Sequence, residues 1–212
     1  MATAREPLEA AIFNHASMAH NTHFFFERLS PAPVPMPAPL KASLERSFGS
    51  LETLRQQFII TASAMFGPGF VWLVRTRDPQ SGNSENFRVL TTYLAGTPYP
   101  GAHWRRQATD MNTVGGVSPD GQAGAHRYFD QSANAYAAAG LPQAGKKEIA
   151  PGGVELWPVL CLNTWEHVWL RDYGIGQGGM GGKVQYAEAW WDAIDWDRVN
   201  ESARIDRKQM SA

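Results

Sequence analysis

Leu156-Trp-Pro-Val-Leu-Cys-Leu-Asn-Thr-Trp-Glu-His-Val-Trp-Leu-Arg-Asp-Tyr173 is the stretch of this 212-residue chain that decides the fold. Its first half is apolar and predicts a buried strand over 154–162. Its second half predicts a helix over 164–172. Asn163 and His167 stand four residues apart, a spacing at which two side chains can share one face of a helix. A hydrogen-bonded pair in the core and a remnant pair of metal ligands both fit that spacing.

The part of the chain before this stretch predicts helices first and strands afterwards. A helix is expected over 8–29, followed by a proline-rich connector over 32–39 that excludes regular helix. Two further helices are expected over 40–66, with Ser50 as the N-cap of the second one. Strands are expected over 70–74 and 86–92, paired as a hairpin.

The part after the stretch predicts a loop and two more helices. The glycine-rich run 174–182 lacks the Lys-Ser/Thr ending of a phosphate-binding loop, so we expect an ordinary loop. A helix is expected over 186–194, and Asp195-Trp196-Asp197 predicts the cap of a last short helix. The overall order predicts an α+β fold, in which a helical N-terminal part (1–66) precedes a C-terminal domain (67–212) with a small antiparallel sheet flanked by helices.

A long insertion is expected inside the C-terminal domain, over about 96–153. The segment is rich in Gly, Ala, Asp, Gln and Ser and has little periodicity, although 128–139 fits a short helix. Two basic pairs in it, Arg105-Arg106 and Lys146-Lys147, are weak candidates for contact with RNA phosphates.

The composition indicates a globular protein without a dominant charge. The chain is 43% hydrophobic and 18% charged, and its formal net charge of −1 excludes a general attraction to nucleic acid. Cys161 is the single cysteine, which excludes intrachain disulfides. No apolar run reaches the length of a membrane span. The N-terminus has no Arg-rich leader, so we expect either no presequence or a chain that begins after one.

Several segments, in order, resemble the iron/manganese superoxide dismutases. Phe66-Gly-Pro-Gly-Phe-Val-Trp-Leu-Val74 is similar to the family's Phe-Gly-Ser-Gly-Trp-Ala-Trp-Leu-Val, and Asn163-Thr-Trp-Glu-His167 resembles its Asp-Val-Trp-Glu-His. The segments 13–31, 47–58 and 186–197 resemble other parts of the family. The resemblance covers roughly 10–75 and 154–200 and implies the dismutase fold.

The same resemblance implies that the metal site has been lost. The family binds its metal through three His and one Asp, and the matching positions here are Thr22 for the second His, Asn163 for the Asp and His167 for the third His. The first His belongs to a helix that would precede residue 8. His20 stands where the family has Trp, and 93–98 holds no clear counterpart of its Asn-Gln-Asp-x-Pro motif. A neutral amide is a poor ligand for such a cation. We therefore expect no catalytic residue, no metal and no cofactor.

A dismutase fold without metal ligands resembles a group of proteins in the small subunit of fungal mitochondrial ribosomes, which pair with each other. The resemblance implies a structural, non-catalytic ribosomal component in the mitochondrial matrix. The expected partners are a second dismutase-like subunit and other small-subunit proteins; a local contact with rRNA stays open, and no membrane contact is expected. In the family the Glu of the Trp-Glu-His motif crosses the dimer interface to the partner's His. We therefore expect Glu166, His167 and Trp169 at an interface.

Other interpretations stay open at this point. One is an active iron or manganese superoxide dismutase, which converts superoxide to oxygen and hydrogen peroxide. Another is a free-standing pseudoenzyme that binds a small molecule in the vacated cavity. His15, His20 and His23 share one predicted helix, but without a cysteine or carboxylate partner their spacing is not specific for zinc. Five tryptophans are expected mainly to pack: Trp165, Trp169, Trp190, Trp191 and Trp196.

Overall fold

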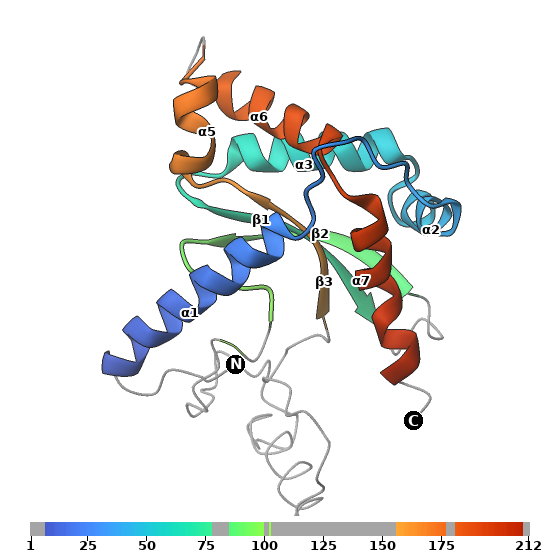
Figure 1. Cartoon of the computed structure of the whole chain (residues 1–212), viewed down its shortest axis with the longest axis horizontal. Helices are drawn as coiled ribbons and strands as arrows, with labels where there is room; N and C mark the ends of the chain where they lie inside the picture. The colour runs from blue at the N-terminus through green and yellow to red at the C-terminus, as the bar shows by residue number, and fades with distance from the viewer. Residues whose placement is uncertain (1–6, 78–84, 100–101, 103–155, 177–180, 210–212) are drawn as a thin grey trace, which may run out of the picture.

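The α+β order expected from the sequence is confirmed. The computed structural model describes residues 7–77, 85–99, 102, 156–176 and 181–209 (Figure 1). Its helices and strands are α1 (Pro7–Phe26), α2 (Ala38–Phe48), α3 (Leu51–Ala64), β1 (Gly69–Arg77), β2 (Glu85–Tyr93), β3 (Leu156–Asn163), α5 (Glu166–Tyr173), α6 (Gly181–Asp192) and α7 (Trp196–Gln209). Most of the expected insertion, including the short helix over 128–139 and both basic pairs, lies outside the described residues. The division into two parts near residue 66 stays a prediction.

Local signals explain where α2 and α3 begin and end. Pro39 lies in the first turn of α2 because a helix needs no N–H donor there. Helix α2 therefore begins at residue 38, inside the predicted connector and two residues earlier than expected. Gly49, at φ 82°, ends α2 in a conformation that favours glycine. Ser50 is the N-cap of α3, as predicted: its hydroxyl accepts the N–H of Thr53 at 3.0 Å.

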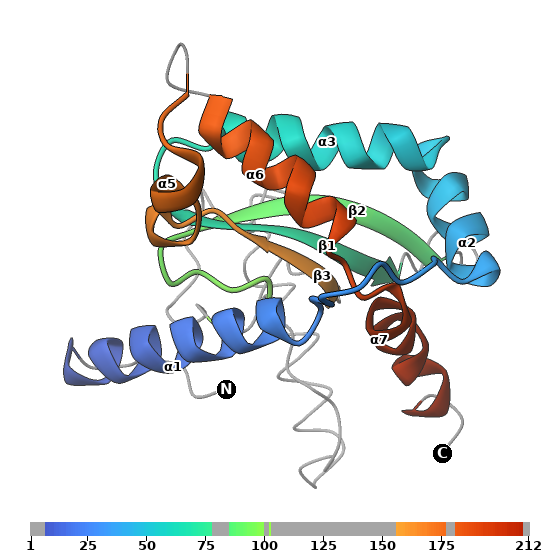
Figure 2. The same cartoon turned by 45° about the horizontal axis from the view of Figure 1, so that its top comes forward.

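The described strands form an antiparallel sheet in the order β2-β1-β3. β1 is central, and residues 70–74 of β1 are fully buried on both faces. On one face, Trp72 of β1 packs against Phe24 of α1, with ring centroids 5.4 Å apart. On the other side of the sheet lie α3 and α6, which pack together through Phe58 and Trp190 (5.3 Å), as Figure 2 shows. None of the described helices is long and apolar enough to cross a membrane.

The pairing of β1 with β3 contains an irregularity at Val159. Leu73 lies opposite Leu160, whereas Val74 lies opposite Pro158, so Val159 is an extra residue in β3. Val159 is fully buried, so its carbonyl needs a partner away from water. That partner is Arg28, whose Nε donates to the Val159 carbonyl at 3.0 Å.

Arg28 joins three parts of the chain through one guanidinium. Besides the Val159 carbonyl, it donates to the Phe24 carbonyl (2.9 Å) at the end of α1 and to the Ser202 hydroxyl (2.8 Å) on α7. Burial lowers the pKa of Arg28, and the carboxylate of Glu27 opposes that shift. Arg28 is thus a buried cation, and its N–H groups hold the end of α1 against β3 and α7.

The end of α1 and the start of α6 also differ from the sequence-based predictions. α1 ends at Phe26, not near residue 29, because residues 28–30 pair with the α6–α7 connection: Ser30 donates to Ala193 and Arg28 accepts from Asp195. α6 begins at Gly181, inside the predicted loop. A Cβ on Gly182 would collide with the Gly174 carbonyl, so only glycine lets the first turn of α6 approach the end of α5 this closely.

The predicted cap of the last helix is confirmed. The Asp195 carboxylate accepts the N–H groups of Asp197 and Arg198, each at 3.1 Å, and α7 starts at Trp196.

Arg28→Met should lower the free energy of unfolding by about 3 kcal/mol, because it leaves the buried Val159 carbonyl without its donor. Arg198→Met is the matched control: Arg198 is exposed and pairs with Glu201 at 3.2 Å, so its loss should cost no more than about 0.5 kcal/mol. Urea denaturation measures both. Equal stability of the two variants would contradict the role given to Arg28.

Candidate functional site

The three residues that match metal-ligand positions of the family differ widely in exposure. Thr22 is partly buried on α1, Asn163 is fully buried at the end of β3, and His167 is exposed on α5. The expectation that Asn163 and His167 share a helix face is wrong, because Asn163 is the last residue of a strand and α5 begins only at Glu166. β1 fixes Asn163 in the sheet by pairing it with Phe70.

Asn163 serves as a local structural brace. Its side-chain oxygen accepts the N–H of Trp165 at 3.0 Å, and its backbone carbonyl accepts the Tyr186 hydroxyl at 2.9 Å. Burial raises the pKa of Tyr186, which keeps that hydroxyl protonated and able to donate. The Asn163 Nδ2 group is buried and has no hydrogen-bond partner among the described residues.

The donor set at this site does not fit a metal cation. The free group of Asn163 is an N–H donor, which presents positive charge where a carboxylate would present negative charge. Thr22 offers a neutral hydroxyl, which is a weak ligand for iron or manganese. Among the described residues, no group of three or more His, Cys, Asp or Glu side chains gathers to hold a metal ion.

The polar face of α1 binds the backbone of the turn after β2. The Ser17 hydroxyl donates to the Ala95 carbonyl (2.5 Å), and the Asn21 amide donates to the Gly96 carbonyl (2.8 Å). Both side chains are buried. Thr22 is one residue further along the helix, about 100° around its axis from Asn21. Sequence reasoning missed Ser17 and Asn21; their i,i+4 spacing was the available signal.

The histidines of α1 do not converge. His20 packs between the rings of Phe24 and Tyr99, with centroids 6.2 and 5.6 Å away. His23 is exposed and lies 3.1 Å from the Glu27 carboxylate, one turn away. His15 is exposed as well. Their arrangement gives no support to a zinc site on this helix.

The three residues expected at an interface differ in exposure as well. Glu166 is partly exposed and His167 is exposed, but Trp169 is buried and donates from its indole to the Thr164 carbonyl at 3.2 Å. Lys183 of α6 lies over the Trp169 ring at 5.7 Å. Burial lowers the pKa of Lys183, and nearby Glu166 opposes that shift. Trp169 therefore packs α5 onto its own chain and offers little surface to another one; contact of Glu166 and His167 with a partner stays a prediction.

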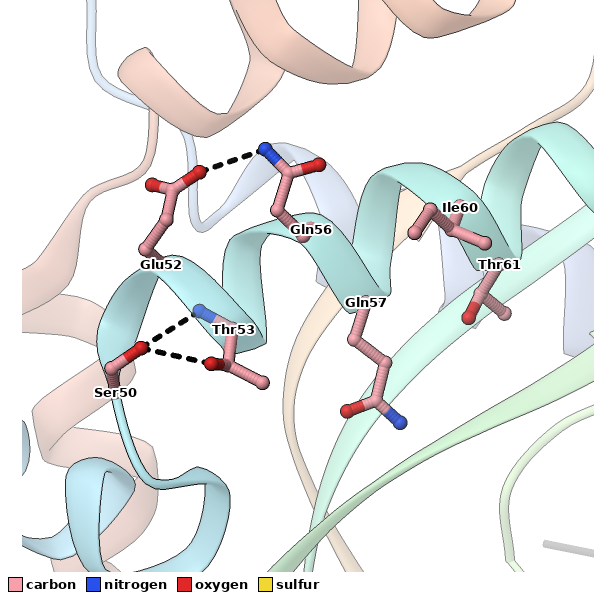
Figure 3. A pocket seen from close by; sticks show the side chains of 7 residues that line it. All are labelled: Ser50, Glu52, Thr53, Gln56, Gln57, Ile60 and Thr61. Carbon is pink, nitrogen blue, oxygen red and sulfur yellow. Dashed lines mark hydrogen bonds between the residues drawn. The ribbon is translucent and has the colours of Figure 1, made fainter.

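A shallow hollow runs along the outward side of α3. It is lined by Ser50 and by α3 side chains between residues 52 and 61 (Figure 3). Its most polar group, the Glu52 carboxylate, already accepts from Gln56 at 2.7 Å, and this hydrogen bond lowers the pKa of Glu52. All the side chains that line it come from one helix and its cap, so nothing opposite them converges on a ligand.

Comparisons with known proteins agree with this geometry. The chain matches the model described as iron/manganese superoxide dismutases, C-terminal domain, over residues 36–102 and 136–202. The small ribosomal subunit proteins mS42 and mS43 of Schizosaccharomyces pombe are 28% and 27% identical to it over 97% and 94% of this chain. The chain spans 72% and 63% of their respective lengths. An iron superoxide dismutase of Helicobacter pylori is 34% identical, but over 41% of this chain and 38% of its own length.

Asn163→Ala should lower the free energy of unfolding by about 1.5 kcal/mol, because the Trp165 N–H loses its acceptor ahead of α5. Asn14→Ala on the exposed side of α1 is the control and should change stability by less than about 0.5 kcal/mol. The measurement is the denaturant midpoint at constant m-value. Wild-type stability of Asn163→Ala would contradict the structural role.

Proposed function

The chain belongs to the iron/manganese superoxide dismutase family, and we propose that it is a structural, non-catalytic component of the mitochondrial small ribosomal subunit. One observation carries this proposal: among relatives that align with more than 90% of the chain, the two small ribosomal subunit proteins are 28% and 27% identical to it, whereas two iron superoxide dismutases are 21% and 22% identical. The proposed function therefore follows the full-length relatives with the higher identity.

The chemistry of the site supports a role without catalysis. Dismutation needs a bound redox metal held by oriented ligands. Here Asn163 uses its oxygen to brace Trp165 and leaves an N–H donor buried, and His167 faces solvent. Three facts thus argue against a bound metal: the free group of Asn163 is an N–H donor, Thr22 offers only a hydroxyl, and the His167 imidazole is exposed to solvent.

The proposed partners are other proteins of the small subunit and a second dismutase-like subunit. Glu166 and His167 lie side by side at the start of α5, where an acid and a base can pair reciprocally with the same groups of a similar fold across a two-fold axis. Among its described neighbours, the His167 ring contacts the Trp165 ring, with centroids 5.7 Å apart. Pairing with a carboxylate of another chain would supply the polar partner that this imidazole lacks within the described structure.

An active dismutase is the alternative function. The observation in its favour is the 34% identity with the Helicobacter enzyme over the matched segment, which exceeds the identity with either ribosomal protein. The content of bound metal separates the two functions.

The protein purified from its own cells should contain far less than one iron or manganese atom per chain and should show no dismutase activity above that of a metal-free control protein. Elemental analysis with a superoxide assay checks this. A content close to one atom of either metal per chain would overturn the non-catalytic proposal.

The tagged chain should sediment with small ribosomal subunits of mitochondria in a sucrose gradient, and it should remain with them after a wash that removes loosely bound proteins. An unrelated tagged mitochondrial matrix protein is the control and should stay near the top of the gradient. Migration of the chain with the free proteins would contradict the ribosomal role.

A further inference from the structure

One long edge of the sheet is open over part of its length. β2 is the edge strand there, because the described strands follow the order β2-β1-β3. Its start is covered by α2, where the Ser47 hydroxyl accepts the N–H of Phe87 at 3.2 Å (Figure 2). Its end is closed by the next turn, since the Tyr93 carbonyl accepts the N–H of Gly96 at 2.8 Å. We call the part between Phe87 and Tyr93 the open edge of β2.

The backbone of Val89 and Thr91 points out of the sheet along the open edge. The Phe87 N–H points away from β1, whereas the Asn86 carbonyl accepts the hydroxyl of Thr76 in β1 at 3.1 Å. The backbone groups of a strand alternate between its two sides, so Val89 and Thr91 face the same way as Phe87. In the part of the chain that the structure describes, neither residue has a hydrogen-bond partner on that side. Each of them therefore presents an N–H donor and a carbonyl acceptor to a further strand.

The open edge lacks the features that usually protect an edge strand. Natural sheets block pairing with other chains through prolines, charged side chains or bulges at their edges. The segment Val89-Leu-Thr-Thr-Tyr93 holds no charged residue and no proline, and its register with β1 is regular. Its β-branched and aromatic residues favour an extended conformation. The open edge is thus suited to receive another strand.

α3 supplies a side wall for such a strand. It contacts both β1 and β2. Gln57 and Thr61 point to the side of α3 that faces the strands, whereas Glu52 points to the opposite side (Figure 3). Ile60 lies beside them and is 63% exposed, which is unusual for an isoleucine. A strand added to β2 at the usual spacing of about 4.8 Å would pass below these side chains and bury Ile60.

The chemistry of the open edge selects a polypeptide. An extended peptide presents N–H and carbonyl groups at the spacing of Val89 and Thr91, and this pairing gives affinity in β-strand addition. RNA binding requires cations that neutralise phosphates. The side chains along the outward side of α3 include no cation; they are Ser50, Glu52, Thr53, Gln56, Gln57, Ile60 and Thr61.

The short length of the open edge favours a single segment over a second copy of this chain. α2 covers the start of β2, and the turn over 93–96 closes its end. A second copy that paired through its own β2 would bring another α2 to this opening. A single extended segment of another protein brings no helix with it.

We propose that the open edge of β2 receives one extended segment of a small-subunit protein outside the dismutase family, which adds a strand to the sheet. This rests on the proposed function, which supplies the particle that holds such a partner. Val89 and Thr91 form the backbone hydrogen bonds with the segment. Ile60 contacts every second side chain of the segment, so small or β-branched apolar residues stand at those positions of the partner.

Site-specific cross-linking tests the proposal. p-Benzoylphenylalanine replaces Ile60 in the tagged chain within its own cells, and the cross-linked peptides are identified after irradiation in both the small-subunit fraction and the remaining lysate. Ile12, which is 69% exposed on α1, carries the same probe as the control. The probe at residue 60 should join one segment of a small-subunit protein outside the dismutase family, and the probe at residue 12 should not join that segment.

Substitutions at Thr91 show whether the backbone of the open edge holds that segment. Thr91→Pro removes the outward N–H and places the proline ring in the path of an added strand, while the hydrogen bonds to β1 stay in place. Thr91→Val keeps the N–H and the β-branched shape, and it is the matched control. The cross-link from residue 60 should fall at least tenfold in Thr91→Pro and stay unchanged in Thr91→Val. Circular dichroism checks that both variants are folded.

Amide hydrogen exchange of the wild-type chain gives a measurement that needs no substitution. The Thr91 N–H should exchange at least tenfold more slowly in the isolated small subunit than in the free chain, because the added strand accepts it. The Phe87 N–H, which already donates to Ser47, is the internal reference and should change less.

The outcomes separate the open edge from the function. A cross-link from residue 60 only to rRNA, to this chain itself, to a second copy or to a dismutase-like subunit, or no cross-link at all, would overturn the proposed contact while sedimentation with the ribosome could still hold. A cross-link that persists in folded Thr91→Pro, or equal exchange of the Thr91 N–H in both states, would overturn it as well. A cross-link that depends on residue 91 but is found only outside the small-subunit fraction would support the open edge as a binding site and refute the ribosomal function.

Discussion

The buried guanidinium of Arg28 is the contact on which the arrangement of α1 depends. β3 contains an extra residue at Val159, and this residue is fully buried. Arg28 satisfies the Val159 carbonyl and also ties the end of α1 to α7. With the end of α1 fixed, Ser17 and Asn21 reach the carbonyls of the turn after β2. A buried cation is stable here because most of its donors are used.

The buried residue at the end of β3, Asn163, is neutral and does not supply the negative charge that a metal cation attracts. A carboxylate at the end of β3 would offer negative charge to a cation, but Asn163 offers an oxygen that is already bound and an N–H that repels cations. The Asn163 amide stabilises the backbone before α5, because its oxygen accepts the N–H of Trp165. Asn163 therefore has a role in the fold whatever its role in binding.

The two faces of α5 have separate roles. Its inner face holds Trp169, which packs onto the chain and lies beside Lys183 of α6. Its outer face holds His167 and Leu170, which are exposed.

The sequence by itself determined the features that depend on neighbours along the chain. Ser50 and Asp195 are caps as predicted, the hairpin of β1 and β2 follows from two apolar runs, and the motif at 163–167 identified the family. Contacts between distant segments decided the rest. Asn163 belongs to a strand because β1 pairs with it, α6 begins at Gly181 because Gly182 can approach Gly174, and Trp169 faces inward because α6 covers it. Ser17 and Asn21 acquired their partners in the same way. Periodicity and capping depend on residues that are close in the sequence. Strand register, close approach of two segments and burial arise only when the helices and strands pack together.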